Sequence, residues 1–219
     1  MSSGTTLYLV RHASTDWNDE GRWQCLDDMP INDKGHVQAE AVSKEFLRLS
    51  EKLDFSRVYS SPLMRAKQTA GPIAKKLGLE VFVEPLLREL DCGLLSGLKL
   101  EEAKSRFSDF YSRLEGNWLD ERYPDGETHR EYVSRCVLPA LDRIFDDNRD
   151  RAVIAVTHAG FIRATIALIM GTPAEIPLRG LCVDNCAYFK FDLERTDDEG
   201  LTGRVSAINV TAHLRKEGL

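Results

Sequence analysis

Two arginines and two histidines stand at the ends of strand-like segments, and their chemistry suits the handling of a phosphoryl group. Arg11 and His12 come directly after the apolar residues 6–10. Arg65 follows a second strand-like segment, and His158 follows a third. Guanidinium groups match the oxygens of a phosphate, and an imidazole can form a covalent intermediate as a nucleophile. If these side chains converge, they predict a site that binds a phosphoryl group and transfers it.

The elements between these residues predict how they are brought together. Short runs rich in strand-forming residues predict strands at 6–10, 57–61, 80–83, 152–156, 187–193 and 205–210. Apolar residues at spacings of three and four predict helices after Asn32, Ser61 and Thr128, with Ser61 as a cap and a kink at Pro139, and an apolar helix at 161–170. This order predicts an α/β fold, a three-layer α/β/α sandwich with a mainly parallel central sheet and an antiparallel pair of strands at one edge.

The chemistry of the site follows from its place in such a sheet and from the motifs that the sequence lacks. Ligands of open α/β sheets bind outside the carboxyl ends of the strands, where Arg11, His12, Arg65 and His158 are expected. The sequence has no G-x-x-x-x-G-K-[ST], G-x-G-x-x-G, H-E-x-x-H or G-x-S-x-G motif, no Cys with Arg six positions later, and no Asp-x-Asp pair. An imidazole therefore remains as the predicted nucleophile.

Composition limits the partners and the compartment. The chain has 219 residues, 29 Lys+Arg against 35 Asp+Glu and a net charge of -6, without a basic run. Nucleic acids and anionic membranes require a basic surface, so we expect neither as a partner. The start of the sequence shows no signal peptide and no apolar run reaches the ~18 residues of a membrane span, which favours the cytoplasm. The five cysteines include no C-x-x-C pair and predict neither a disulfide framework nor a zinc site.

Several motifs resemble those of a known family. Residues 9–18, Leu-Val-Arg-His-Ala-Ser-Thr-Asp-Trp-Asn, are similar to the R-H-G-x-T/S-x-x-N signature of the histidine phosphatase superfamily, in its phosphoglycerate mutase-like branch. The resemblance continues, in family order, through segments 21–24, 28–30, 35–39, 60–70, 87–89, 126–128 and 158–160. It covers most of residues 6–171 and implies one phosphoglycerate mutase-like domain over 1–219.

The resemblance implies a role for each residue of the site. His12 would attack phosphorus and become a phosphohistidine that water hydrolyses, with Glu89 as general acid and then base. The phosphate-binding residues would be Arg11, Thr15, Asn18, Arg65, His158 and Ala159. No metal and no cofactor are implied, because side chains supply the positive charge. The expected partner is a small phosphate ester, and a homodimer is left open.

Departures from the family pattern affect the shape of the pocket. Ala13 and Ala159 replace glycines that are common after the two histidines, and Cys25 replaces one after Gln24. An added methyl group is harmless at negative φ and crowds the phosphate at positive φ. Residues 94–127 show no clean periodicity and predict an insertion that covers the site as a lid.

Two alternatives to a phosphatase remain. A cofactor-dependent phosphoglycerate mutase is disfavoured because residues 89–93, Glu-Leu-Asp-Cys-Gly, lack the E-R-H-Y-G-like segment of mutases. A non-catalytic phosphoprotein-binding module is disfavoured because it would not need both His12 and Glu89. For the role of the acid, Asp91 is an alternative to Glu89. Outside the site, we expect His36, His129 and His213 to face solvent, and Arg163 to form an ion pair that supports its helix.

Overall fold

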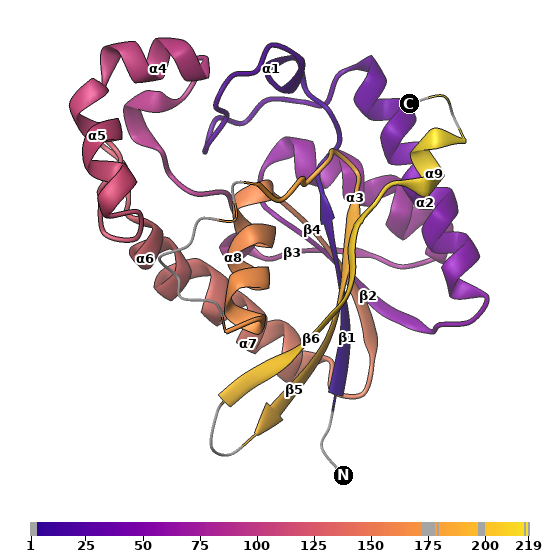
Figure 1. Ribbon diagram of the computed structural model, residues 1–219. Helices are drawn as coiled ribbons and strands as arrows, with labels where there is room; N and C mark the ends of the chain where they lie inside the picture. Colours follow the sequence, from indigo (N-terminus) through magenta and orange to yellow (C-terminus); the bar gives the residue numbers. More distant parts are fainter. Residues whose placement is uncertain (1–3, 172–177, 179, 197–199, 217, 219) are drawn as a thin grey trace.

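Six strands of the described residues form one sheet in the computed structural model, which describes residues 4–171, 178, 180–196, 200–216 and 218 (Figure 1). Their order across the sheet is β3-β2-β4-β1-β5-β6. The strands are β1 (Gly4–Arg11), β2 (Phe55–Ser60), β3 (Val81–Val83), β4 (Ala152–Thr157), β5 (Tyr188–Thr196) and β6 (Gly200–Val210). Strands β1 to β4 are parallel, whereas β5 and β6 pair antiparallel at the edge next to β1. The predicted α/β fold with a mainly parallel sheet is confirmed.

Helices cover both faces of this sheet (Figure 1). The longer ones are α2 (Asp33–Ser50), α3 (Met64–Leu77), α7 (Leu138–Asp147) and α8 (Ala159–Ile169). The shorter helical segments are α1 (Asp16–Asp19), η1 (Pro85–Leu87), η2 (Gly93–Leu95), α4 (Leu100–Arg106), α5 (Ser108–Gly116), α6 (His129–Tyr132), η3 (Val133–Val137) and α9 (Ala212–Arg215). In Figure 1, α2, α3 and α9 lie on one side of the sheet and α6, α7 and α8 on the other.

The alternating side chains of β1 divide the core into two parts. Leu7 and Leu9, both fully buried, belong to the part that also contains Phe161 of α8. Their neighbours Tyr8 and Val10 belong to the part beneath α2 and α3. Because successive side chains of a strand point to opposite faces, one short apolar strand anchors both layers. The carboxyl end of β1 is thereby held rigidly, and it leads into Arg11 and His12.

Two local predictions need correction. Ser61 does not cap α3: the N-cap is Leu63, and the Ser61 hydroxyl accepts a hydrogen bond from the Leu63 N–H at 3.3 Å. The kink expected at Pro139 is replaced by a π-helical turn, Val133–Val137, after which α7 begins with Pro139 in its first turn. The wide turn leaves the proline ring at a helix start, where a missing N–H costs no intrahelical bond.

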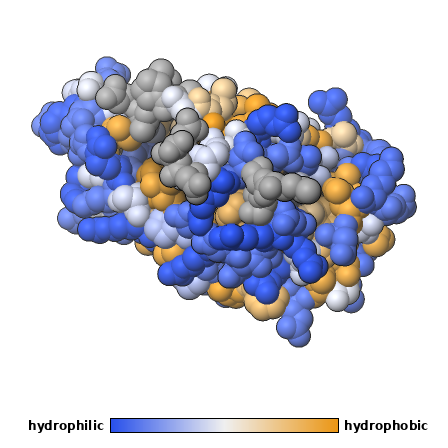
Figure 2. Space-filling view, turned by 90° about the horizontal axis from the view of Figure 1, so that it is seen from below, coloured by the Kyte–Doolittle hydropathy of each residue, from blue (hydrophilic) through white to orange (hydrophobic). Residues whose placement is uncertain are grey.

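The face seen from below in Figure 1 lies opposite the end of β1 that carries Arg11 and leads into His12. Figure 2, seen from below, shows a mostly hydrophilic surface on which apolar residues are scattered in small groups. In the described parts of the chain, no helix is both long and apolar enough to cross a membrane.

Candidate active site

A cavity of about 1240 Å³ opens at the carboxyl ends of the parallel strands and collects most of the predicted site residues. Six of them line it, namely Arg11, His12, Asn18, Arg65, Glu89 and Ala159. The ring of His158 lies behind this wall, with its centroid 5.2 Å from that of His12. Thr15 is fully buried and does not line the cavity. The positions selected by the strand-end rule therefore converge, as predicted.

The environment of His12 leaves one ring nitrogen available as a nucleophile. Its Nδ1 lies 2.8 Å from the backbone oxygen of Ala13. A carbonyl oxygen only accepts, so Nδ1 carries the proton and Nε2 keeps its lone pair. Burial, and then the charges of Arg65 and Arg11, hold the pKa of His12 well below its usual value. His12 is therefore a neutral imidazole at neutral pH, the form that can attack phosphorus.

Two guanidinium groups, those of Arg11 and Arg65, line the same cavity as His12. Arg11 Nη1 donates to Val183 O at 2.6 Å, and Arg65 donates to Asp27 O and Cys25 O at 2.6 and 2.7 Å. Within the described part of the protein, the buried Nε of each arginine has no hydrogen-bond partner. Loss of hydration lowers the pKa of both arginines to about 10, which still leaves them protonated at neutral pH. A buried cationic donor without an acceptor favours an anion.

His158 is oriented by Ser61, a residue to which the sequence assigned only a capping role. His158 Nε2 lies 2.7 Å from Ser61 Oγ, whereas the buried Nδ1 has no partner among the described residues. Ser61 Oγ already accepts the Leu63 N–H, so its single proton is free to donate to Nε2. When Ser61 donates in this way, the proton of His158 lies on Nδ1. Burial lowers the pKa of His158, so this donor is uncharged.

Glu89 is held by two backbone N–H groups, one of the next residue and one at the start of α8. Its carboxylate accepts from Leu90 N at 2.9 Å and from Gly160 N at 3.2 Å. A Cβ atom at Gly160 would lie only 2.2 Å from Glu89 Oε1, so a glycine is required for this approach. Asp91 does not line the cavity, because its carboxylate accepts the N–H of Gly93 at 3.0 Å. The geometry thus favours Glu89 over Asp91 as the acid.

Thr15 and Asn18 have different places in the site. Thr15 caps α1, and its hydroxyl donates to Asn18 Oδ1 at 3.2 Å. Asn185, which the sequence analysis missed, donates from Nδ2 to His12 O at 2.9 Å and to Asn18 Oδ1 at 3.1 Å. Thr15 and Asn185 therefore position Asn18, and only Asn18 reaches the cavity. No motif marks Asn185, because it lies 173 residues from His12 in the sequence.

The departures from the glycine pattern have different consequences. Ala13 and Ala159 are not among the described residues with positive φ, so their methyl groups cause no strain. Cys25 has φ +44°, in the left-handed region that favours glycine. Its backbone oxygen nevertheless accepts from Arg65, so the strained residue supports the phosphate-binding side.

The sequence predicted no disulfide framework, but two of the five cysteines are joined in the structure. Cys25 and Cys92 form a disulfide, with their Cα atoms 5.7 Å apart and a separation of 67 positions in the sequence. Spacing along the chain does not reveal such a pair, because only the fold brings the two loops together. The disulfide connects the loop that holds Arg65 with the segment that follows Glu89.

We expect the Cys25–Cys92 disulfide to stabilise the folded protein by roughly 2–4 kcal/mol, because it restricts a long loop of the unfolded chain. Urea unfolding with and without dithiothreitol measures this difference. Cys92→Ser should abolish the response to reductant, whereas Cys182→Ser, which alters an exposed free thiol, should keep it. Equal stability of the wild type under both conditions would show that the pair does not cross-link the protein.

Residues 94–127 supply another wall of the cavity. Their helices α4 and α5 lie at the upper left of Figure 1. The rings of Trp118 and His129 stack with centroids 4.0 Å apart, and Tyr123 meets Trp23 at 6.1 Å. His129 lines the cavity, so it does not face solvent as expected. His213 is also misassigned, because it is buried and stacks on Tyr188. That residues 94–127 act as a lid over the site stays a prediction.

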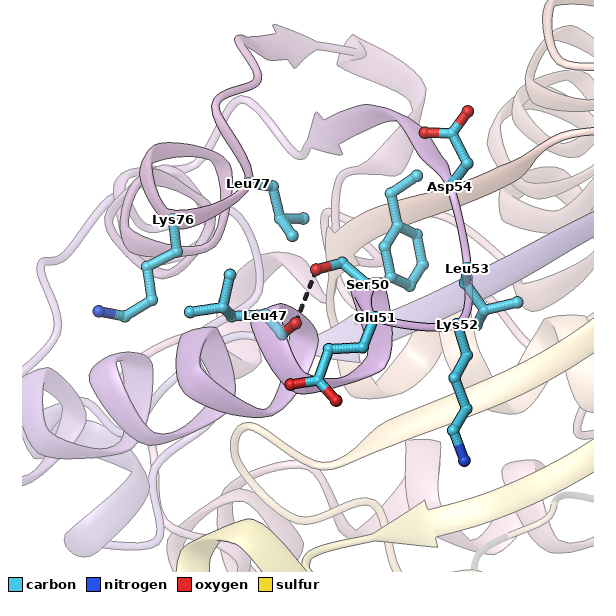
Figure 3. Close-up of a pocket in the computed structure, with 9 residues that line it drawn as sticks. Leu47, Ser50, Glu51, Lys52, Leu53, Asp54, Lys76 and Leu77 are labelled. Carbon is cyan, nitrogen blue, oxygen red and sulfur yellow. Dashed lines mark hydrogen bonds between the residues drawn. The ribbon is translucent and has the colours of Figure 1, made fainter.

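A second hollow, of about 450 Å³, lies at the opposite end of the sheet (Figure 3). It lies between the ends of α2 and α3 and the start of β2, and Ser50 Oγ donates to Leu47 O at 2.6 Å beside it. Its described lining includes Lys52, Lys76 and Asp54 but none of the predicted site residues. No group of three or more His, Cys, Asp or Glu side chains suited to a metal ion occurs in the described ranges.

Comparison with known proteins agrees with the chemistry of this cavity. The family model of the histidine phosphatase superfamily (branch 1) matches residues 7–202. The chain belongs to this superfamily. Phosphoglycerate mutase-like protein 4 of Arabidopsis thaliana is 39% identical to this histidine phosphatase over 160 residues, which cover 72% of this chain and 68% of that protein. Phosphoserine phosphatase 1 of Hydrogenobacter thermophilus is 31% identical over 212 residues, 95% and 93% of the two chains.

Solved structures show the same fold as this chain. A mycobacterial glucosyl-3-phosphoglycerate phosphatase in complex with VO3 superposes with a TM-score of 0.78 at 25% identity. The match covers 94% of this chain and 99% of that one. Relatives named as phosphatases and as mutase-like proteins share the fold, so the superfamily supports phosphatase or mutase chemistry in general.

Proposed function

We propose that this protein is a metal-independent phosphatase that hydrolyses small phosphomonoesters through a phosphohistidine at His12. The observation that carries the proposal is the tautomer of His12. Its Nδ1–H is held by Ala13 O, which leaves the Nε2 lone pair free in the cavity that Arg11 and Arg65 also line. A nucleophile and two cations in one cavity meet the main demand of phosphoryl transfer, which is positioning and charge stabilisation.

The first step forms the bond between His12 Nε2 and phosphorus and breaks the bond between phosphorus and the ester oxygen. The protonated Glu89 carboxyl group gives its proton to the departing oxygen, which leaves as an alcohol. Arg11, Arg65 and the Nδ1–H of His158 stabilise the charge on the remaining phosphoryl oxygens.

In the second step, the Glu89 carboxylate takes a proton from a water molecule that attacks phosphorus. The bond between phosphorus and His12 breaks, inorganic phosphate leaves, and Glu89 is again protonated. Glu89 donates a proton in the first step and accepts one in the second, so the two-step path needs only one acid–base residue.

The second candidate, a phosphoglycerate mutase, is motivated by the mutase-like relative. It is disfavoured because residues 90–93 turn back through the Asp91–Gly93 hydrogen bond and carry no mutase-like segment. Incubation with 3-phosphoglycerate separates the two activities. A phosphatase releases inorganic phosphate without forming the 2-isomer, whereas isomerisation without net release would overturn the proposal in favour of a mutase.

A rapid-quench experiment tests the mechanism itself. Under the proposal, mixing with a labelled phosphate ester yields an acid-labile phosphoenzyme before steady-state phosphate release. Inactivity across a broad ester panel, together with tight capture of a phosphorylated protein, would instead indicate a binding module.

A further inference from the structure

One face of α8 forms a wall of the cavity that extends well beyond the phosphate-binding groups. Gly160, Arg163, Ala164, Ala167 and Leu168 all line the cavity, at the spacing of successive helical turns. Gly160 contacts Glu89, and Arg163 lies three residues further, about 4.5 Å along the helix axis. A substrate whose phosphate is at His12 would therefore extend its leaving group past Arg163.

Arg163 forms no ion pair with a described residue, although the sequence predicted one. Its Nη2 donates to Leu181 O at 3.1 Å, and its buried Nε has no hydrogen-bond partner in the described parts of the chain. A backbone oxygen is a neutral acceptor, so no described carboxylate neutralises the positive charge of Arg163. An unsatisfied buried donor on a cation is costly unless a ligand supplies an acceptor.

The other cations of the cavity differ in this respect. Arg22 is paired with Glu20 at 2.6 Å, and Lys104 lies 3.8 Å from Glu101. Arg11 and Arg65 serve the phosphoryl group under the proposed function. Among the described arginines and lysines that line the cavity, Arg163 is thus the one that has neither a carboxylate partner nor an anion assigned to it. Its repulsion contributes to the lowered pKa of Arg11, so the two charges act on the same space.

We propose that Arg163 is a specificity-determining residue that binds a second anionic group of the substrate, a carboxylate close to the phosphorylated oxygen. A single uncompensated charge matches one carboxylate, whereas a second phosphate would bring about two negative charges to one arginine. The preferred substrates are then phosphate esters of hydroxy acids or hydroxy amino acids. This inference rests on the proposed phosphatase function and adds the substrate class.

Matched pairs of esters test the inference. O-Phosphoserine differs from O-phosphoethanolamine, and 3-phosphoglycerate from glycerol 3-phosphate, by the carboxylate. We expect the wild type to prefer the carboxylated member in kcat/KM by about 10- to 100-fold, as for a charge-assisted hydrogen bond. Arg163→Met should remove this preference by raising KM for the carboxylated ester. The value of kcat/KM for the ester without the carboxylate should stay nearly unchanged. Arg163→Lys should retain part of the preference, because it keeps the charge but not the fork.

Arg22→Met is the matched control, because it removes a cavity arginine that is already paired with a carboxylate. It should leave the ratio of the kcat/KM values for the carboxylated and the uncarboxylated ester unchanged. Thermal melting checks that every variant is folded. An equal ratio in wild type and Arg163→Met overturns the inference while the phosphatase function stands. Hydrolysis of p-nitrophenyl phosphate but of neither carboxylated ester also overturns it. Failure to hydrolyse any ester overturns the proposed function itself, and the inference with it.

Discussion

His12→Ala is expected to lower kcat for any phosphate ester by roughly four to six orders of magnitude, as for the removal of a covalent nucleophile. The expectation follows from the fixed tautomer, since no other imidazole in the cavity has the same freedom. His158 Nε2 is engaged by Ser61, and His129 is stacked on Trp118. Steady-state phosphate release measures the loss.

A second readout distinguishes a lost nucleophile from a damaged pocket. His12→Ala should form no acid-labile phosphoenzyme but should still bind inorganic phosphate, because Arg11, Arg65 and His158 remain. His36→Ala is the matched control, since His36 is exposed on α2 and should leave kcat unchanged. His12→Asn provides a polar replacement if the alanine variant is unstable. Hydrolysis at the wild-type rate by a folded variant would contradict the mechanism.

Gly160→Ala is expected to lower kcat for alkyl phosphates by about 10²- to 10³-fold, within the range for loss of a general acid. The new Cβ would lie 2.2 Å from Glu89 Oε1, so the carboxylate must move away from the reacting oxygen. The backbone conformation at Gly160 is not left-handed, and alanine is favourable in helices, so stability should be retained. The expected result is a folded enzyme with a misplaced acid.

Three comparisons sharpen this test. The loss should be smaller for p-nitrophenyl phosphate, whose leaving oxygen needs little help from an acid. Combined with Glu89→Gln, Gly160→Ala should add almost no further loss, because both changes act through one carboxylate. Gly71→Ala is the control: nothing lies within 4 Å of its added Cβ inside α3, so activity should be unchanged. An unaltered kcat in Gly160→Ala would contradict the assignment of Glu89.

Disagreements between sequence-based expectation and structure occur where long-range packing decides. His213 carries no sequence signal of burial, yet α9 places it against Tyr188 and the backbone of Cys186. Arg163 was expected to pair with a carboxylate, but its helix face lines the cavity, where its Nη2 donates to Leu181 O. Periodicity predicts that a residue lies on a helix and says little about which neighbours that face meets.

The sequence by itself determined the strands, the main helices and the strand-end positions of Arg11, His12, Arg65 and His158. These features depend on local patterns: apolar runs, helical spacing and the rule that ligands bind at the carboxyl ends of parallel strands. Resemblance to the family added Glu89 and Asn18, which no local pattern marks as functional.

Only the tertiary structure decided which groups are free to act. The Cys25–Cys92 disulfide, the Asn185 contacts and the approach of Gly160 to Glu89 join segments 67, 173 and 71 residues apart. The tautomer of His12 and the unused donors of Arg11, Arg65 and Arg163 depend on which carbonyls lie within hydrogen-bond distance. Local patterns encode the elements, but the chemical state of a buried group depends on neighbours that only the folded chain brings together.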